Sequence, residues 1–142
     1  MFQFNPETYD WFGWIRSKPE TEQWLTSRYI RFICKDDKAV IWCSGENGGI
    51  LAMGLVTTYP QKSALAPEQA LHYRKKDDVM KFLKKPSVII KYTKLFVDRP
   101  ILQDKCRKDK ILSSMDVFKN PEGTNFKIAK KHWNRIIDLN DV

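Results

Sequence analysis

The sequence is poor in the residues on which disulfide frameworks and most metal sites are built. It has only three cysteines and two histidines among 142 residues. The cysteines, Cys34, Cys43 and Cys106, have no histidine or second cysteine near them at metal-ligand spacing. This excludes a disulfide framework and a zinc-binding pattern. We expect all three to be small apolar side chains in a reducing compartment.

Long apolar runs are absent as well. No stretch reaches the roughly 18 consecutive apolar residues that a transmembrane helix needs, and residues 2–6 lack the basic and apolar segments of a secretion signal. We therefore expect a cytoplasmic protein with no membrane association. The length of 142 residues and the hydrophobic content of 42% suit a single domain, residues 1–142, that buries its own core.

Arrangements of residues for catalysis are missing too. His72 lies in a charged segment and His132 on what we expect to be a solvated helix face, and neither belongs to a motif of nucleophilic catalysis. In the pairs Asp36-Asp37 and Asp77-Asp78 adjacent carboxylates point to different sides, so turns explain them better than a metal or acid–base centre. We expect no enzyme activity, no metal and no cofactor.

The positive charge is confined to the second half of the chain. Residues 1–71 hold seven Lys and Arg against eight Asp and Glu, whereas residues 72–142 hold eighteen against nine. A surplus of this kind favours a polyanionic partner such as nucleic acid. A lysine-rich solvated face is the alternative, and the charge alone does not separate the two.

Hydrophobic patterning predicts a mixed chain of the α+β class. Short β-branched runs predict strands, and apolar residues at helical spacing predict helices. The clearest feature is a hairpin whose turn, residues 44–49, is rich in Gly and Asn. No element is predicted for the polar stretch 16–23. The expected strands are 2–4, 38–43, 50–57 and 87–97, and the expected helices are 7–15, 28–34 after a Ser27 cap, 68–85 and 129–139, with short helical pieces near Leu102 and Ile111.

Aromatic residues make up 13% of the chain, and two tryptophans have small polar neighbours. Trp24 is followed by Thr26, and Trp42 by Ser44 and Gly45. An indole face beside hydroxyl and bare backbone groups suits a planar heterocycle, because the ring stacks while the polar groups contact its edge. A core position is the alternative, and the commoner one for a tryptophan.

Two further segments offer groups that can bind a base or a phosphate. In the loop 119–126, Asn, Gly and Thr residues crowd together before the last helix and expose backbone N–H groups. An ordinary turn uses the same residue types. Asn5 follows the first predicted strand, and its side-chain amide is expected to be presented at the end of that strand.

Four motifs together resemble the EVE domain family of the PUA-like superfamily. They are residues 2–10 (FQFNPETYD), 40–45 (VIWCSG), 49–56 (GILAMGLV) and 120–126 (NPEGTNF), the last followed by Trp133. The resemblance runs through nearly the whole chain. It is strongest to EVE domains at the N-termini of McrBC-type, modification-dependent restriction systems.

The resemblance implies a small, strongly bent β-barrel of five to six strands flanked by short helices, related to YTH domains that hold methylated adenine in an aromatic cage. It implies that Trp24 walls a pocket, that Trp42 lies near its floor, and that the loop before the last helix closes it. The implied pocket residues are Asn5, Trp24, Thr26, Trp42, Ser44, Gly45, Tyr59, Thr124 and Asn125, and the implied phosphate contacts are Lys119 and Lys127.

The implied function is that of a non-enzymatic reader of modified DNA. One base, a modified cytosine or a methylated adenine, would be flipped into the pocket, and the domain would give specificity to a restriction or defence system with a nucleotide-hydrolysing motor and a nuclease as partners. Modified RNA is the alternative ligand. A protein-interaction module with a vestigial pocket is the alternative function.

Overall fold

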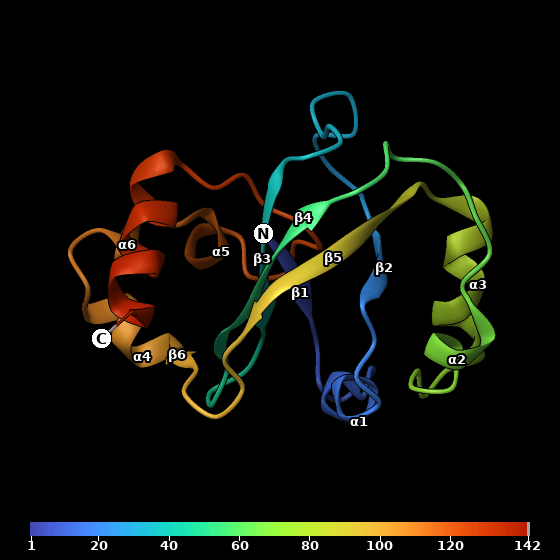
Figure 1. Cartoon of the computed structure of the whole chain (residues 1–142), viewed down its shortest axis with the longest axis horizontal. Coiled ribbons are helices and arrows are strands. Elements are labelled where there is room, and N and C mark those ends of the chain that lie inside the picture. The colour runs from blue at the N-terminus through green and yellow to red at the C-terminus, as the bar shows by residue number, and fades with distance from the viewer. Residues whose placement is uncertain (142) are drawn as a thin grey trace.

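Six strands form one mixed, strongly curled sheet in the computed structural model, which describes residues 1–141 (Figure 1). The order is β1-β3-β4-β5-β2, with β6 paired to β4. Only β1 and β3 run parallel, and every other pairing is antiparallel. The α+β class and the bent sheet expected from the sequence are confirmed. The strands are β1 (Phe2–Phe4), β2 (Thr21–Leu25), β3 (Lys38–Cys43), β4 (Gly49–Val56), β5 (Ser87–Leu95) and β6 (Ile101–Leu102).

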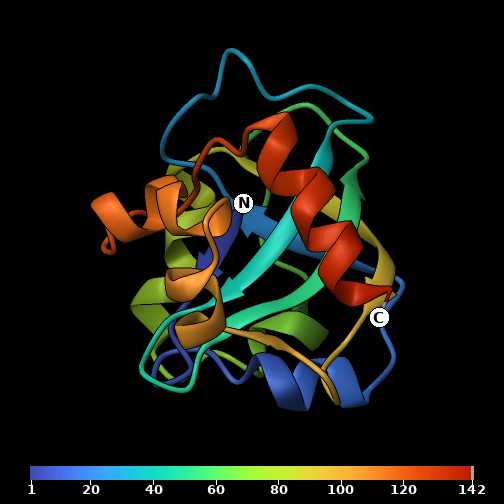
Figure 2. The ribbon, with the colours of Figure 1, turned by 90° about the vertical axis from the view of Figure 1, so that its left-hand side faces the viewer.

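Short helices cover the sheet on two sides. α4, α5 and α6 lie on one side and α2 and α3 on the other (Figure 1). Figure 2 shows α6 crossing the face formed by β3 and β4. The helices are α1 (Trp11–Arg16), α2 (Pro67–Ala70), α3 (Lys76–Lys84), α4 (Gln103–Lys108), the 3-10 helix η1 (Leu112–Ser114), α5 (Asp116–Lys119) and α6 (Lys130–Asn140).

Strand β3 divides the interior into two cores. Side chains alternate between the faces of a strand, so Ala39, Ile41 and Cys43 enter a core with β1, α1 and β2. Val40 and Trp42 enter a second core beneath α4, α5 and α6. Because both faces of β3 are covered, its residues from Ala39 to Cys43 are all buried. Residues at the start of β3 therefore lie between the two cores.

The strands and the closing helix expected from the sequence are confirmed to within two residues, but strand β2 is missed. Its burial alternates, with Glu22 and Trp24 facing inward. A carboxylate in a core position conceals the apolar alternation that marks a half-buried strand. The stretch therefore looks polar although it is part of the sheet.

The predicted helix 28–34 is wrong. The segment forms turns, and Tyr29 has a φ of 59°, outside the range of a right-handed helix. The predicted helix 68–85 is divided into α2 and α3. Cys43 and Cys106 are buried, whereas Cys34 is exposed.

A buried acid joins β2 to its neighbours. The Glu22 carboxylate, 2% exposed, accepts hydrogen bonds from the Tyr9 hydroxyl at 2.7 Å, from the Trp11 indole N–H at 3.1 Å and from the Tyr92 hydroxyl. Burial raises the pKa of Glu22 to about 8, because desolvation outweighs the hydrogen bonds that favour the charged form. The folded protein therefore keeps a proton on Glu22 at pH values where the unfolded chain has lost it.

This proton makes stability depend on pH. Burial also lowers the pKa of the Met1 ammonium group to about 5, and that group contributes to the pH dependence with the opposite sign. Between pH 4.5 and about pH 8 Glu22 binds a proton in the folded state that it has lost in the unfolded state, so its own contribution to the free energy of unfolding falls as the pH rises through this window. The slope of this contribution reaches at most about 1.4 kcal/mol per pH unit. We predict that Glu22→Gln, which does not titrate, removes this contribution and so makes the slope of unfolding free energy against pH, measured in urea, less negative than in the wild type. Glu7→Gln, at an exposed site, is the matched control and keeps the slope. Equal slopes in wild type and Glu22→Gln would contradict the assignment.

Candidate functional site

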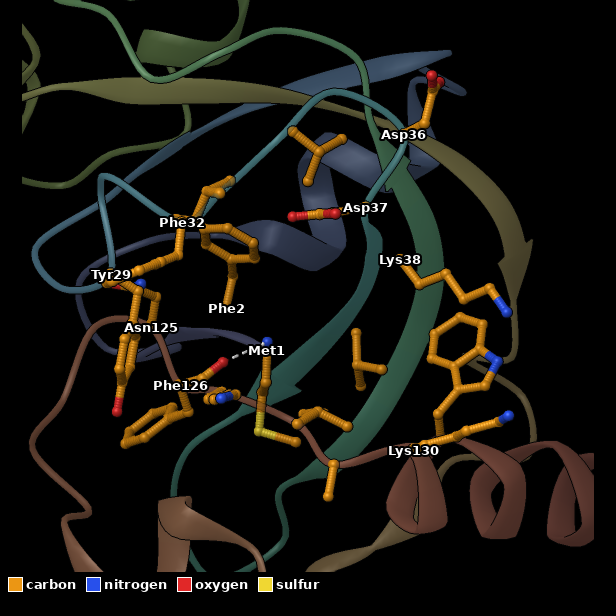
Figure 3. Close-up of a pocket in the computed structure, with 17 residues that line it drawn as sticks. Met1, Phe2, Tyr29, Phe32, Asp36, Asp37, Lys38, Asn125, Phe126 and Lys130 are labelled. Atoms are coloured by element: carbon orange, nitrogen blue, oxygen red, sulfur yellow. Dashed lines mark hydrogen bonds between the residues drawn. The ribbon is translucent and has the colours of Figure 1, made fainter.

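A cavity of about 740 Å³ opens beside the starts of β1 and β3 (Figure 3). Its position follows from the parallel pairing of these strands, which brings Met1 and Lys38 to the same edge of the sheet. Cavities of this size commonly hold small ligands. It is lined by Met1, Phe2, Tyr29, Phe32, Ile33, Asp36, Asp37, Lys38, Val40, Val56, residues 125–130 and Trp133.

One wall of the cavity is an aromatic loop, residues 27–37, which connects β2 to β3. Tyr29 is half-buried, and Phe32 is 77% exposed. The backbone N–H of Phe32 donates to the Tyr29 carbonyl at 2.8 Å, so the two residues form one turn. Both rings lie on the same side of the cavity in Figure 3. The Phe32 ring thus offers an open face for stacking.

Asn125 fixes this aromatic loop to the segment before α6. Its side-chain oxygen accepts from the backbone N–H groups of Ser27 at 2.9 Å and Arg28 at 3.1 Å, and its amide donates to the Arg28 carbonyl at 2.7 Å. Asn125 is 3% exposed. Its hydrogen bonds are thus directed to the protein, and its role is to shape the cavity.

The opposite wall carries positive charge. Lys38 and Lys130 lie across the cavity from the aromatic loop in Figure 3, and Lys127 also lines the cavity. No carboxylate of residues 1–141 lies within 4.0 Å of these three amines. The Lys38 amine lies 5.2 Å from the ring centroid of Trp133, a cation–π distance. These amines are available to an anionic ligand.

A carboxylate also faces the cavity. Asp37 points inward in Figure 3, whereas Asp36 points away. The Asp37 oxygen Oδ2 accepts from the Cys34 backbone N–H at 2.8 Å. The main chain of Asp37 is held as well, because its carbonyl accepts from the Val56 N–H at 2.8 Å. The cavity therefore combines aromatic rings, ammonium groups and a fixed carboxylate.

Trp24 and Trp42 do not wall this cavity, which corrects the expectation for both. Trp24 is 5% exposed and Trp42 is 2% exposed, and they belong to different cores. Trp24 packs against Phe2, Phe4 and Tyr9. The alternative considered for both, a core position, is what the structure shows, because both rings are buried among core residues.

Asn5, Ser44 and Gly45 gather at the far end of β1 and β3, away from the cavity. The backbone N–H of Ser44 donates to the Phe4 carbonyl at 3.0 Å. The Asn5 side chain accepts from the Glu7 backbone N–H at 2.9 Å and so stabilises a turn. The parallel strands place these three residues together, but at the edge opposite Lys38.

Four further residues expected at the site also lie outside the cavity lining. Thr26 is buried, and its hydroxyl donates to the Pro86 carbonyl at 2.9 Å. Tyr59 is 63% exposed on the loop after β4. Thr124 accepts from the Gln3 N–H at 2.9 Å through its carbonyl. The Lys119 amine lies 4.0 Å from Asp116. Of the expected residues, only Asn125 and Lys127 line the cavity.

Five residues that line the cavity are not among those predicted from the sequence: Tyr29, Phe32, Lys38, Lys130 and Trp133. The signal available was the aromatic content of residues 28–34, but apolar residues at helical spacing led to a helix. The shape of this loop depends on Asn125, 97 residues away from Arg28. Long-range hydrogen bonds of this kind leave no local pattern.

His132 is buried rather than solvated, which corrects the expectation. Its Nε2 lies 2.8 Å from the Ser114 hydroxyl, and its Nδ1 accepts from the Ala129 N–H at 3.3 Å. Burial, together with the charge of Lys131, lowers the pKa of the ring. His132 therefore ties η1 to the beginning of α6 and supports the cavity wall from behind.

Two kinds of feature, a cluster of metal ligands and a membrane-spanning helix, are absent from residues 1–141. No group of three or more His, Cys, Asp or Glu side chains is placed to hold a metal ion. No helix combines the length and the apolar character needed to cross a membrane.

Solved structures from distant organisms share this fold. A hypothetical protein from Leishmania major has 14% identity and a TM-score of 0.71, over 99% of this chain and 92% of its own. A Pseudomonas putida protein has 16% identity and a TM-score of 0.69, over 98% and 97%. Human THYN1 protein, in complex with DNA that contains 5-methylcytosine, has 14% identity and a TM-score of 0.69, over 99% and 96%. At such identities the likeness shows the fold alone.

A comparison with curated proteins found no match. A comparison with protein families found the EVE domain, which matches residues 1–139. The chain therefore belongs to the EVE domain family, as its motifs indicate.

Proposed function

We propose that this protein binds DNA carrying a modified base and holds that base, swung out of the double helix, in the cavity between the aromatic loop and α6. The observation that carries the proposal is the meeting of an exposed aromatic ring, Phe32, with three unpaired lysines around one cavity. Membership of the EVE family and the DNA complex of human THYN1 support it.

The proposed contacts divide into stacking and charge. Extruding a base costs a few kcal/mol, and stacking on an aromatic side chain returns roughly 1–3 kcal/mol. Phosphate contacts of Lys38, Lys127 and Lys130 supply the rest, so binding is salt-dependent. Burying one methyl group adds only about 0.8 kcal/mol, about fourfold in affinity. A methyl group alone therefore gives modest discrimination.

We also propose a cellular role, which is a more specific claim than the binding of DNA. We infer that the domain supplies specificity to a modification-dependent restriction or defence system in the cytoplasm, with a motor and a nuclease as partners. This part rests only on the sequence resemblance to EVE domains of McrBC-type systems. RNA is the competing ligand, since single-stranded RNA also presents unstacked bases to aromatic side chains.

Stacking of the base is expected to depend on the Phe32 ring. Phe32→Ala should weaken binding to a duplex with one modified cytosine about tenfold, because it removes the open ring. The side chain is 77% exposed, so the fold should be unchanged. Tyr59→Ala is the matched control, at a side chain that is 63% exposed and outside the cavity. Fluorescence anisotropy measures both. Equal affinities for the two variants would place the binding surface elsewhere, and tighter binding of single-stranded RNA of the same sequence would favour an RNA ligand.

The salt dependence of binding is expected to depend on the three lysines of the cavity. Replacing Lys38, Lys127 and Lys130 together by Gln should lower the slope of log affinity against log salt by up to about three, since each phosphate contact contributes about 0.9. A triple variant with the same net charge, Lys62, Lys84 and Lys85 to Gln, should keep the slope, because these exposed lysines lie outside the cavity. Equal losses in both triple variants would indicate general charge attraction instead of a site.

A further inference from the structure

The cavity has more room than a flipped base uses. Volumes of 300–1,000 Å³ enclose drug-sized ligands, and the cavity measures about 740 Å³. A cytosine is one six-membered ring, and methylation adds a single carbon. A base stacked on Phe32 therefore leaves space toward Lys38 and Asp37 for a substituent of considerable size.

Charged groups of both signs face the cavity. Asp37 points into it, whereas Asp36 points away, and Lys38, Lys127 and Lys130 also line it. An anionic substituent would meet the Asp37 carboxylate, and a cationic one would meet three ammonium groups. A neutral substituent avoids both conflicts, because like charges that lie close together repel.

The polar groups on the wall call for a substituent that both donates and accepts hydrogen bonds. Asp37 offers only acceptors when ionised, and lysine amines only donate. The Asp37 oxygen Oδ1 has no hydrogen-bond partner among residues 1–141, whereas Oδ2 is bound to the Cys34 N–H. Because the main chain of Asp37 is bonded to Val56, the free oxygen is held in place. Hydroxyl groups meet both requirements, and the C–H face of a sugar can lie on an exposed aromatic ring.

We propose that the cavity takes a base carrying a neutral, hydroxylated substituent of sugar size, such as glucosylated hydroxymethylcytosine, in preference to a merely methylated base. This inference rests on the proposed function. Asp37 accepts hydrogen bonds from hydroxyls of the substituent, and Phe32 covers the base or the sugar ring. The lysines contact the substituent and the neighbouring phosphates.

The test compares four duplexes of one sequence whose central cytosine is unmodified, methylated, hydroxymethylated or glucosylated at the hydroxymethyl group. The full chain should bind the glucosylated duplex at least tenfold more tightly than the methylated one, with the hydroxymethylated duplex between them. Asp37→Asn keeps an acceptor for the Cys34 N–H but presents a donor to the cavity, and it should lower this ratio at least threefold. Asp98→Asn, an equal change of charge at an exposed site outside the cavity, should keep the ratio.

Each outcome decides one point. Binding of the methylated duplex as tight as that of the glucosylated one overturns the inference and leaves the proposed function standing. Equal affinity for all four duplexes overturns the proposed function itself. A preference for the glucosylated duplex that Asp37→Asn leaves unaltered removes Asp37 from the recognition of the substituent.

Discussion

The cavity depends on the two-sided pairing of strand β1. This strand of three residues pairs in parallel with β3 on one side. On the other, the Gln3 N–H donates to the Thr124 carbonyl at 2.9 Å and the Phe126 N–H donates to the Met1 carbonyl at 2.8 Å. The segment before α6 is therefore aligned with the start of β3, although about 85 residues of chain separate them. Without β1, no strand would connect the segment before α6 to the start of β3, and the two walls of the cavity would not be held in position relative to each other.

Asn125 connects the aromatic loop to the segment that β1 holds in place. The loop has no helix or strand of its own, and loops of this kind are mobile unless other contacts hold them. Three of its backbone groups bond to a single buried amide, so Tyr29 and Phe32 stay near the lysines of the opposite wall. The open rings are thus presented at little entropic cost at the moment of binding.

The sequence predicted the fold better than the site. The β3–β4 hairpin was predictable because strand-forming residues flank a turn of Gly and Asn, a local signal. Strand β2 was not, because Glu22 occupies an inward position that only its partners Tyr9, Trp11 and Tyr92 make tolerable. The tryptophans drew attention as pocket walls because polar residues stand next to them in sequence. The hydroxyl of Thr26, for example, donates to the Pro86 main-chain carbonyl instead of facing a pocket.

The separation of the Glu22 network from the residues that face the cavity explains how such a fold can serve different ligands. None of the residues of the Glu22 network lines the cavity, so a change there costs stability without removing a cavity group. Phe2, Val40 and Phe126 belong to the cores and also line the cavity. The exposed groups of the cavity, Phe32, Asp37 and Lys130 among them, come from a loop and from the start of a helix and lie outside both cores. In the proposed function, selectivity among modified bases depends on these exposed residues, which β1 and Asn125 hold in place. In this chain they join a carboxylate to three amines, and from this combination we infer a preference for a neutral polar substituent over a methyl group.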